Sequence, residues 1–206
     1  MKSPVVDGSS NHSYDVSNEK DLTERYALVT YSVSRRRAIL SADVAADQDN
    51  DLTRMGDGPV AKGVITCISG RVLDPSGHPV QHAVIEIWQC DYQGFYYHPK
   101  TMQRRDPTYQ GFGTTITDAD GRYLFRTIRP VPYDNRAPHI HFKVRGTAFD
   151  EFTTQMYIVG ELRNDHDFAL NKLRRPEERE RLIIPLKPAR YEAKALAGRF
   201  NIVLGY

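Results

Sequence analysis

The chain has 206 residues, which is enough for one domain with a hydrophobic core and too few for two. Its 28 Lys and Arg nearly balance its 26 Asp and Glu, so charge gives no reason to expect nucleic acid or an anionic membrane as partner. No apolar run approaches the roughly 20 residues of a membrane span, and no apolar signal core follows the N-terminus. We therefore expect a soluble, cytoplasmic protein. Cys67 and Cys90 do not make a disulfide framework and are predicted to be reduced, packed thiols.

The N-terminal part of the chain differs from the rest in composition and in hydrophobic periodicity. Residues 1–61 are polar and poorly periodic, and we interpret them as an arm or loop region suited to contacts with a neighbouring subunit. Within them, Tyr26 to Val33 is the one segment with the composition of a strand. Residues 62–206 are predicted to form the main folded domain, and the chain contains no internal repeat.

Short apolar segments separated by turn signals follow from residue 63 onward. A Gly-containing turn at Asp118 to Gly121 predicts a hairpin between the segments on either side of it. Helix-like composition is confined to residues 165–181, where Pro176 suits the start of a helix. This pattern predicts a mainly β protein, an antiparallel β-sandwich with long loops and one or two short helices. The predicted strands cover residues 63–73, 82–90, 114–117, 122–126, 139–144, 152–159 and 200–204.

The stretch from Pro132 to Phe142 gathers the strongest chemical signal. It holds a tyrosine, an arginine and a His-x-His pair within eleven residues. Side chains alternate along a strand, so His139 and His141 are expected on one face and Ile140 on the other. That geometry suits two ligands on one metal ion. The alternative is a pair of half-buried histidines that are hydrogen-bonded to backbone carbonyls.

Two imidazoles and two phenols would be a distinctive ligand set. A second tyrosine cluster, Tyr96 and Tyr97, lies upstream, and only one of two adjacent residues can face the site. A free phenol has a pKa of about 10, but a hard, highly charged ion can deprotonate it. This favours ferric iron, for which Tyr is a known ligand. A carboxylate-containing site or a hydrolytic zinc site is disfavoured, because residues 142–146 contain no acid or cysteine.

Two other residues, Arg136 and Gln155, each have a structural and a functional interpretation. Arg136 could stabilise negative charge beside a metal site or form a structural ion pair. Gln155 could line the site or cap a neighbouring backbone group. Trp88, the only tryptophan, is expected to pack in the core.

Taken together, these segments resemble the intradiol ring-cleavage dioxygenases that act on catechol, protocatechuate and hydroxyquinol, and they are closest to the protocatechuate 3,4-dioxygenase type. The resemblance covers residues 62–205. It rests on Gly70-Arg71-Val72-Leu73-Asp74, Val84-Ile85-Glu86-Ile87-Trp88-Gln89, Thr117-Asp118-Ala119-Asp120-Gly121, Phe125-Arg126-Thr127-Ile128, Arg136-Ala137-Pro138-His139-Ile140-His141-Phe142, Thr154-Gln155-Met156-Tyr157 and Arg199-Phe200-Asn201-Ile202-Val203-Leu204.

The resemblance implies a prealbumin-like sandwich and ring cleavage by O2 between two hydroxylated carbons, which gives a cis,cis-muconate-type product. It implies one Fe(III) per site, with a small aromatic diol and O2 as partners. It also implies a homo-oligomer, with a hetero-oligomer as the alternative. The resemblance further assigns residues by role: the metal ligands Tyr96, Tyr133, His139 and His141, and the catalytic residues Tyr133 (as internal base), Arg136 and Gln155.

The departures from the family pattern leave the substrate open. The segment between Tyr133 and His139 is shorter than in protocatechuate enzymes and lacks the tryptophan that usually follows the second tyrosine. The helical N-terminal region of the catechol and hydroxyquinol enzymes has no counterpart in this sequence. The alternative function is a non-catalytic module, because residues 70–84 and 117–123 also resemble the prealbumin-like or carboxypeptidase-regulatory sandwich.

Overall fold

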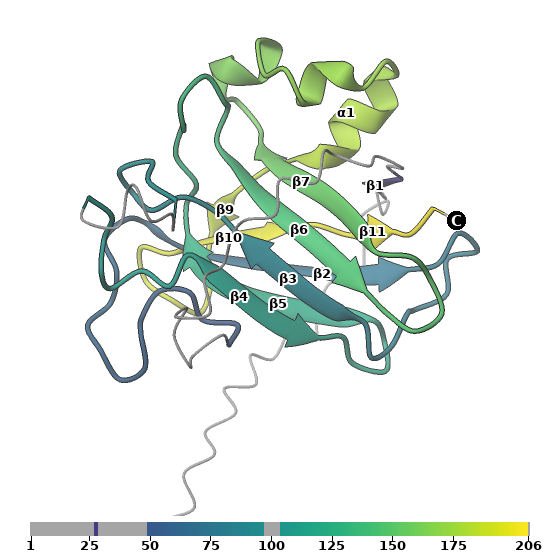
Figure 1. The fold of residues 1–206 in the computed structure, drawn as a ribbon, viewed down its shortest axis with the longest axis horizontal. Coiled ribbons are helices and arrows are strands. Elements are labelled where there is room, and N and C mark those ends of the chain that lie inside the picture. The colour runs from purple at the N-terminus through teal and green to yellow at the C-terminus, as the bar shows by residue number, and fades with distance from the viewer. Residues whose placement is uncertain (1–26, 29–48, 97–103, 206) are drawn as a thin grey trace, which may run out of the picture.

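The computed structural model describes residues 27–28, 49–96 and 104–205, and two facing β-sheets form its centre (Figure 1). The first sheet has the order β4 (Phe112–Ile116), β3 (Val84–Trp88), β6 (His139–Arg145), β7 (Phe152–Ile158) and β8 (Ile183–Ile184). The second sheet has the order β1 (Ala27–Leu28), β11 (Ile202–Val203), β2 (Ile65–Leu73), β10 (Leu196–Arg199) and β9 (Lys187–Pro188), with β5 (Arg122–Ile128) also paired to β2.

The predicted sandwich is confirmed, and its sheets are mixed. The long ladders β3–β4, β3–β6, β6–β7 and β2–β5 are antiparallel. Parallel pairs join β2 to β10 and β11, β1 to β11, and β7 to β8. The parallel pairs therefore come mainly from short strands near the C-terminus.

The hairpin predicted around Gly121 is wrong. The turn itself is present, since the Gly121 N–H donates to the Asp118 carbonyl at 3.0 Å and Gly121 has a φ of 71°. However, β4 pairs with β3 and β5 pairs with β2, so the chain crosses from one sheet to the other at this point. The Thr117 hydroxyl anchors the crossing, because it accepts from the Ala83 N–H and donates to the Val80 carbonyl, both at 2.8 Å.

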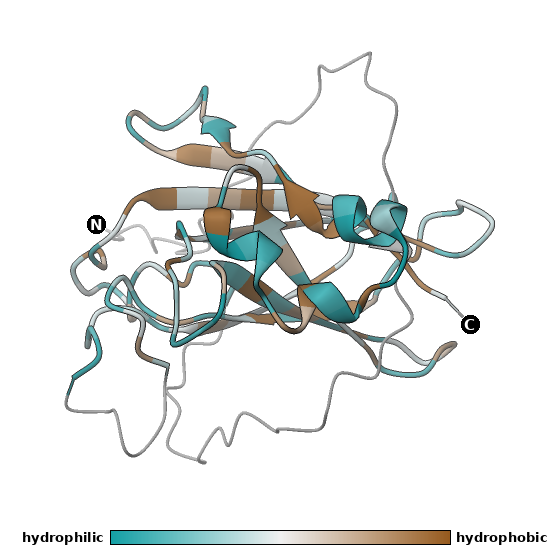
Figure 2. Cartoon of the chain, turned by 90° about the horizontal axis from the view of Figure 1, so that it is seen from above, coloured by the Kyte–Doolittle hydropathy of each residue, from teal (hydrophilic) through white to brown (hydrophobic). Residues whose placement is uncertain are grey.

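The core lies between the two sheets and follows the alternation of the strands. On β6, Ile140, Phe142 and Val144 are fully buried and face the second sheet. The intervening residues, His139 and His141, therefore lie on the outer face of the first sheet, as predicted. In Figure 2 the hydrophobic colour concentrates on the strands, while the helical turns are mostly hydrophilic. The remaining fully buried core side chains include Ile68, Ile85, Ile87, Phe125 and Ile128.

Residues 49–61 pack against the sandwich. The Leu52 side chain is fully buried in the core, and its N–H donates to the Arg126 carbonyl at 2.8 Å. Of the predicted strand at Tyr26 to Val33, only β1 lies in the described residues, where it pairs with β11. The division of the chain at residue 61 stays a prediction.

Short helices follow β7. They are η1 (Leu162–Asp165), η2 (Leu170–Lys172) and α1 (Pro176–Leu182), and Pro176 is the first residue of α1, as predicted. None of the helices in the described part of the chain is long and apolar enough to cross a membrane. Cys67 and Cys90 are buried free thiols, which confirms their prediction. Burial raises the pKa of the Cys90 thiol to about 12.

Candidate metal centre and substrate site

The histidine pair forms the floor of the site. Strand β6 turns both imidazoles to the same side, and their Nε2 atoms lie 3.1 Å apart. The Nδ1 atom of His139 is 2.7 Å from the Ala137 carbonyl oxygen. A carbonyl can only accept, so Nδ1 carries the proton and the Nε2 lone pair is free for a metal ion.

Burial keeps both imidazoles neutral. Burial first and the nearby Arg136 cation second lower the pKa of His139 to about 4. The pKa of His141 is also lowered, first by burial and then by the charge that His139 would carry. Neutral imidazole is the form that binds metals, so the site is suited to coordination at pH 7.

Trp88 belongs to this site and not to the core as expected, because it is half-buried on the outer face of the first sheet. It is the register partner of His141 across the β3–β6 ladder. The two rings are stacked, with centroids 4.7 Å apart and planes within 1° of parallel. The indole therefore fixes the plane of the His141 ring. This contact has no signal in the sequence, because it depends on the register between two strands.

Tyr96 reaches the histidines from the loop after β3. Its phenol oxygen is 3.3 Å from Nε2 of His139. Burial raises the pKa of the Tyr96 phenol well above its ordinary value, so without a metal ion it would be protonated. Tyr97, the other member of the pair, lies outside the described residues.

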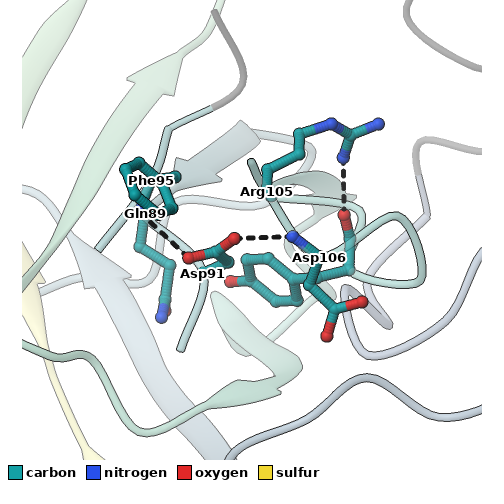
Figure 3. A pocket seen from close by; sticks show the side chains of 7 residues that line it. Gln89, Asp91, Phe95, Arg105 and Asp106 are labelled. Atoms are coloured by element: carbon teal, nitrogen blue, oxygen red, sulfur yellow. Dashed lines mark hydrogen bonds between the residues drawn. The ribbon is translucent and has the colours of Figure 1, made fainter. Parts of the chain in front are cut away.

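Asp91 holds the loop that carries Tyr96. Its carboxylate is buried and accepts three backbone N–H groups: those of Gln93 at 2.9 Å, Phe95 at 3.0 Å and Asp106 at 2.7 Å. Figure 3 shows the bonds from Phe95 and Asp106 at the small pocket that these residues line. The turn before Tyr96 is therefore fixed from inside the protein.

Tyr133 lies beside Tyr96 on a second loop. A tight turn brings the Arg136 N–H to the Tyr133 carbonyl at 2.8 Å, with Asp134 at a φ of 50°. The Tyr133 ring meets the Tyr96 ring edge-on, with centroids 4.8 Å apart, and 40% of the residue is exposed. The two loops abut at Gly94, where a Cβ atom would come within 3.0 Å of the Pro132 carbonyl oxygen.

Arg136 and Gln155 are joined in one polar network. An Arg136 Nη2 hydrogen bond reaches Gln155 Oε1 at 2.5 Å, and another reaches the Tyr157 hydroxyl at 2.9 Å. Its Nε donates to Asp167 at 2.7 Å. The ion pair that was one of the two interpretations of Arg136 is present and buried, and its role beside a metal site stays a prediction.

Tyr157 and Asp167 were missed by the sequence analysis. Tyr157 had a signal, because it lies two residues after Gln155 on a predicted strand and so on the same face; in the structure it pairs in register with His139. Asp167 had none, because it lies beyond η1 in a segment whose packing the sequence does not reveal. Gln155, for its part, is the register partner of His141.

The residues present fit a ferric ion. Donor atoms about 2.1 Å from one metal ion lie roughly 3 Å apart when they are neighbours in its coordination shell. Nε2 of His139 matches this spacing to both neighbours, at 3.1 Å from Nε2 of His141 and 3.3 Å from the Tyr96 phenol oxygen. Among residues 49–96 and 104–205, no group of three or more His, Cys, Asp or Glu could hold a metal ion. The donor atom that lies beside the imidazoles is the Tyr96 phenol oxygen, which favours a hard trivalent ion over zinc.

Comparison with known proteins decides the family. A family model described as Dioxygenase matches residues 40–205. The protocatechuate 3,4-dioxygenase beta chain of Burkholderia cepacia is 34% identical over 181 residues, which cover 81% of this chain and 75% of that one. The chain belongs to the intradiol ring-cleavage dioxygenase family. The predicted resemblance is thereby confirmed, and the protein is an oxidoreductase rather than a non-catalytic sandwich module.

Other proteins similar to this intradiol dioxygenase differ from it in length. Catechol 1,2-dioxygenase of Acinetobacter baylyi is 32% identical over 139 residues, which are 56% of this chain and 43% of that one. The dioxygenase domain of a carbohydrate-binding fusion protein from Streptomyces sp. SirexAA-E has 28% identity, a TM-score of 0.58 and coverage of 75% of this chain and 86% of that one. The 3-chlorocatechol 1,2-dioxygenase of Rhodococcus opacus, at 22% identity, a TM-score of 0.62 and coverage of 75% and 64%, supports the fold.

Proposed function

We propose that this intradiol dioxygenase holds one Fe(III) through Tyr96, Tyr133, His139 and His141. With O2 it would cleave a catechol-type ring between its two hydroxylated carbons and release a cis,cis-muconate-type diacid. The observation that carries the proposal is the convergence of two neutral imidazoles and the Tyr96 phenol on one point. The edge contact of Tyr133 with Tyr96 supports a fourth ligand from the second loop.

Bound Fe(III) would supply the electron-withdrawing centre that makes a coordinated aromatic diol reactive toward O2. The chain's own residues would handle protons and position. Tyr133 is the most exposed of the four ligands, so its phenolate oxygen is the one suited to accept a proton from the incoming diol. His139, His141 and Tyr96 are held by strand, stacking and loop contacts and would stay in place.

Arg136 and Gln155 would act on the diol rather than on the metal ion. Hydrogen bonds fix both side chains on the same outer face as the histidines. A guanidinium in a partly desolvated site stabilises the negative charge of a deprotonated diol. Gln155 would orient the aromatic ring of the diol. Trp88, which stacks on His141, would keep the plane of that imidazole fixed.

The relatives suggest the substrate class. Their names include protocatechuate, catechol, hydroxyquinol and chlorocatechol dioxygenases, so we propose a substituted or unsubstituted catechol. We further propose a cytoplasmic homo-oligomer in which residues 1–61 make subunit contacts. A hetero-oligomer is favoured by one observation, namely that the Burkholderia cepacia relative is the beta chain of its enzyme.

Product identity tests this proposal. The iron-loaded protein is supplied with catechol, protocatechuate, hydroxyquinol and 3-chlorocatechol while O2 uptake and products are measured. We expect one O2 consumed per ring and a diacid product that carries both oxygen atoms from labelled O2. A semialdehyde product would show cleavage outside the diol, and no O2 uptake with any diol would exclude the proposed activity.

A further inference from the structure

Asp167 is the most heavily hydrogen-bonded carboxylate near the site. It is fully buried. Its Oδ2 accepts the Arg136 Nε–H at 2.7 Å and the Ala137 N–H at 2.9 Å. Its Oδ1 accepts the N–H groups of Ala169 and Leu170, both at 3.0 Å, and lies 3.2 Å from the Tyr157 hydroxyl. A buried charge with this many donors is held in one position.

These bonds leave one end of the Arg136 guanidinium available. Its Nε is bound by Asp167, and its Nη2 is bound by Gln155 and Tyr157. Within the described part of the chain, Nη1 makes no hydrogen bond. The Phe168 ring lies over the guanidinium, with its centroid 4.7 Å from Cζ, and closes a further side. The orientation of the one free amino group is therefore set by Asp167 and its neighbours.

The Asp167 carboxylate also binds the backbone segment that leads into the histidines of β6. Oδ2 binds the Ala137 N–H, and the Ala137 carbonyl accepts the His139 Nδ1–H at 2.7 Å. One residue from a distant segment thus ties Arg136 to the backbone that fixes the His139 ring. Ala137 is fully buried, so this link is shielded from water.

We infer that Asp167 is a positioning residue, which aims Nη1 of Arg136 at the diol held by the metal centre. The inference rests on the proposed function. It differs from a purely structural role for the ion pair, because it makes substrate affinity depend on Asp167 through Arg136. Tyr157 takes part as the hydroxyl that joins Arg136 to Gln155.

The test is an anaerobic titration of the iron-loaded protein with catechol, followed by the visible tyrosinate band, so that no turnover is needed. Asp167→Asn keeps the size of the side chain but places an amide donor against Arg136 and Ala137. We expect the dissociation constant for catechol to rise about tenfold to a hundredfold, the usual range for residues that orient ligand-binding groups. Asp165→Asn, on an exposed neighbour in η1, is the matched control and should leave that constant unchanged.

A double variant shows whether Asp167 acts through Arg136. In an Arg136→Gln background, adding Asp167→Asn should cause no further loss of catechol affinity. A tenfold further loss, or wild-type affinity in Asp167→Asn alone, would overturn the inference while the proposed function stands. A wild-type protein that takes up no iron would overturn both.

A third variant covers the case in which Asp167→Asn does not fold. Tyr157→Phe leaves Asp167 with Arg136 and its backbone donors, and removes only the hydroxyl bound to Nη2. We expect a severalfold weaker catechol affinity with unchanged iron content. Unchanged catechol affinity in this variant would contradict the arrangement we infer.

Discussion

The Nε2 atoms of His139 and His141 lie 3.1 Å apart on the outer face of the first sheet. Two neutral imidazoles that project from one face of a strand at this distance can both present Nε2 to a single metal ion. Stacking of Trp88 on one ring and the Ala137 carbonyl on the other keep both in place. This relationship is the basis of the proposed iron centre.

Replacing either histidine should remove most of the iron. In His139→Ala or His141→Ala, one of four ligands is lost, and we expect iron content to fall by about tenfold or more after dialysis against a chelator. Metal analysis on the folded protein is the measurement. His78→Ala, on an exposed histidine, is the control and should retain its iron; equal iron in all three variants would contradict the ligand assignment.

Replacing Tyr133 by Phe should separate catalysis from metal binding. The ring contact with Tyr96 is kept, while the oxygen that would accept the diol proton is lost. We expect turnover to fall by about a hundredfold, at the lower end of the range for general bases, with part of the iron retained. Stopped-flow mixing with catechol should also show slower binding. Tyr92→Phe is the control, and full activity in Tyr133→Phe would exclude the role as internal base.

Loss of the Asp91 carboxylate should loosen the loop of Tyr96. Asp91→Ala leaves three backbone N–H donors without their acceptor, and each buried unpaired donor costs about 1–3 kcal/mol. We expect a clear drop in the urea midpoint and a weaker tyrosinate band at saturating iron. Asp57→Ala, at an exposed position, should change neither. A stable variant with the wild-type band would show that Asp91 does not position Tyr96.

The Asp167–Arg136 pair should make stability depend on acid. Burial alone would raise the pKa of the Asp167 carboxyl, but the Arg136 guanidinium and backbone donors hold it below its ordinary value of 3.8. The stabilisation is therefore fully present above pH 3.8 and is lost as pH falls below it. At neutral pH we expect the free energy of unfolding of the metal-free wild type to be about 1–3 kcal/mol larger than that of Asp167→Asn. Urea unfolding should show this difference shrinking below pH 4; a constant difference down to pH 3 would contradict it.

Local sequence patterns predict the parts of this protein that depend on local geometry. The period of two along β6 is sufficient to put His139 and His141 on one face, and it places the core residues Ile140 and Phe142 on the other. The turn at Gly121 is also visible in the sequence. Whether such a turn joins two strands of one sheet or two sheets depends on distant pairing, which is why the hairpin prediction failed.

The rest of the site depends on contacts between distant segments. Trp88 meets His141 only through the register of β3 on β6. Asp167 meets Arg136 only because the segment after β7 packs over the start of β6, a separation of 31 residues along the chain. Neither of these two contacts can be predicted from the local sequence. The residues that position the ligands are accordingly harder to predict than the ligands themselves.

A visible spectrum of the purified protein, with iron quantified on the same sample, tests the central claim most directly. We expect a broad tyrosinate-to-Fe(III) charge-transfer band at about one iron per chain, which shifts when catechol is added without O2. A protein that stays colourless after loading with ferric or ferrous iron would contradict the two-tyrosine, two-histidine centre.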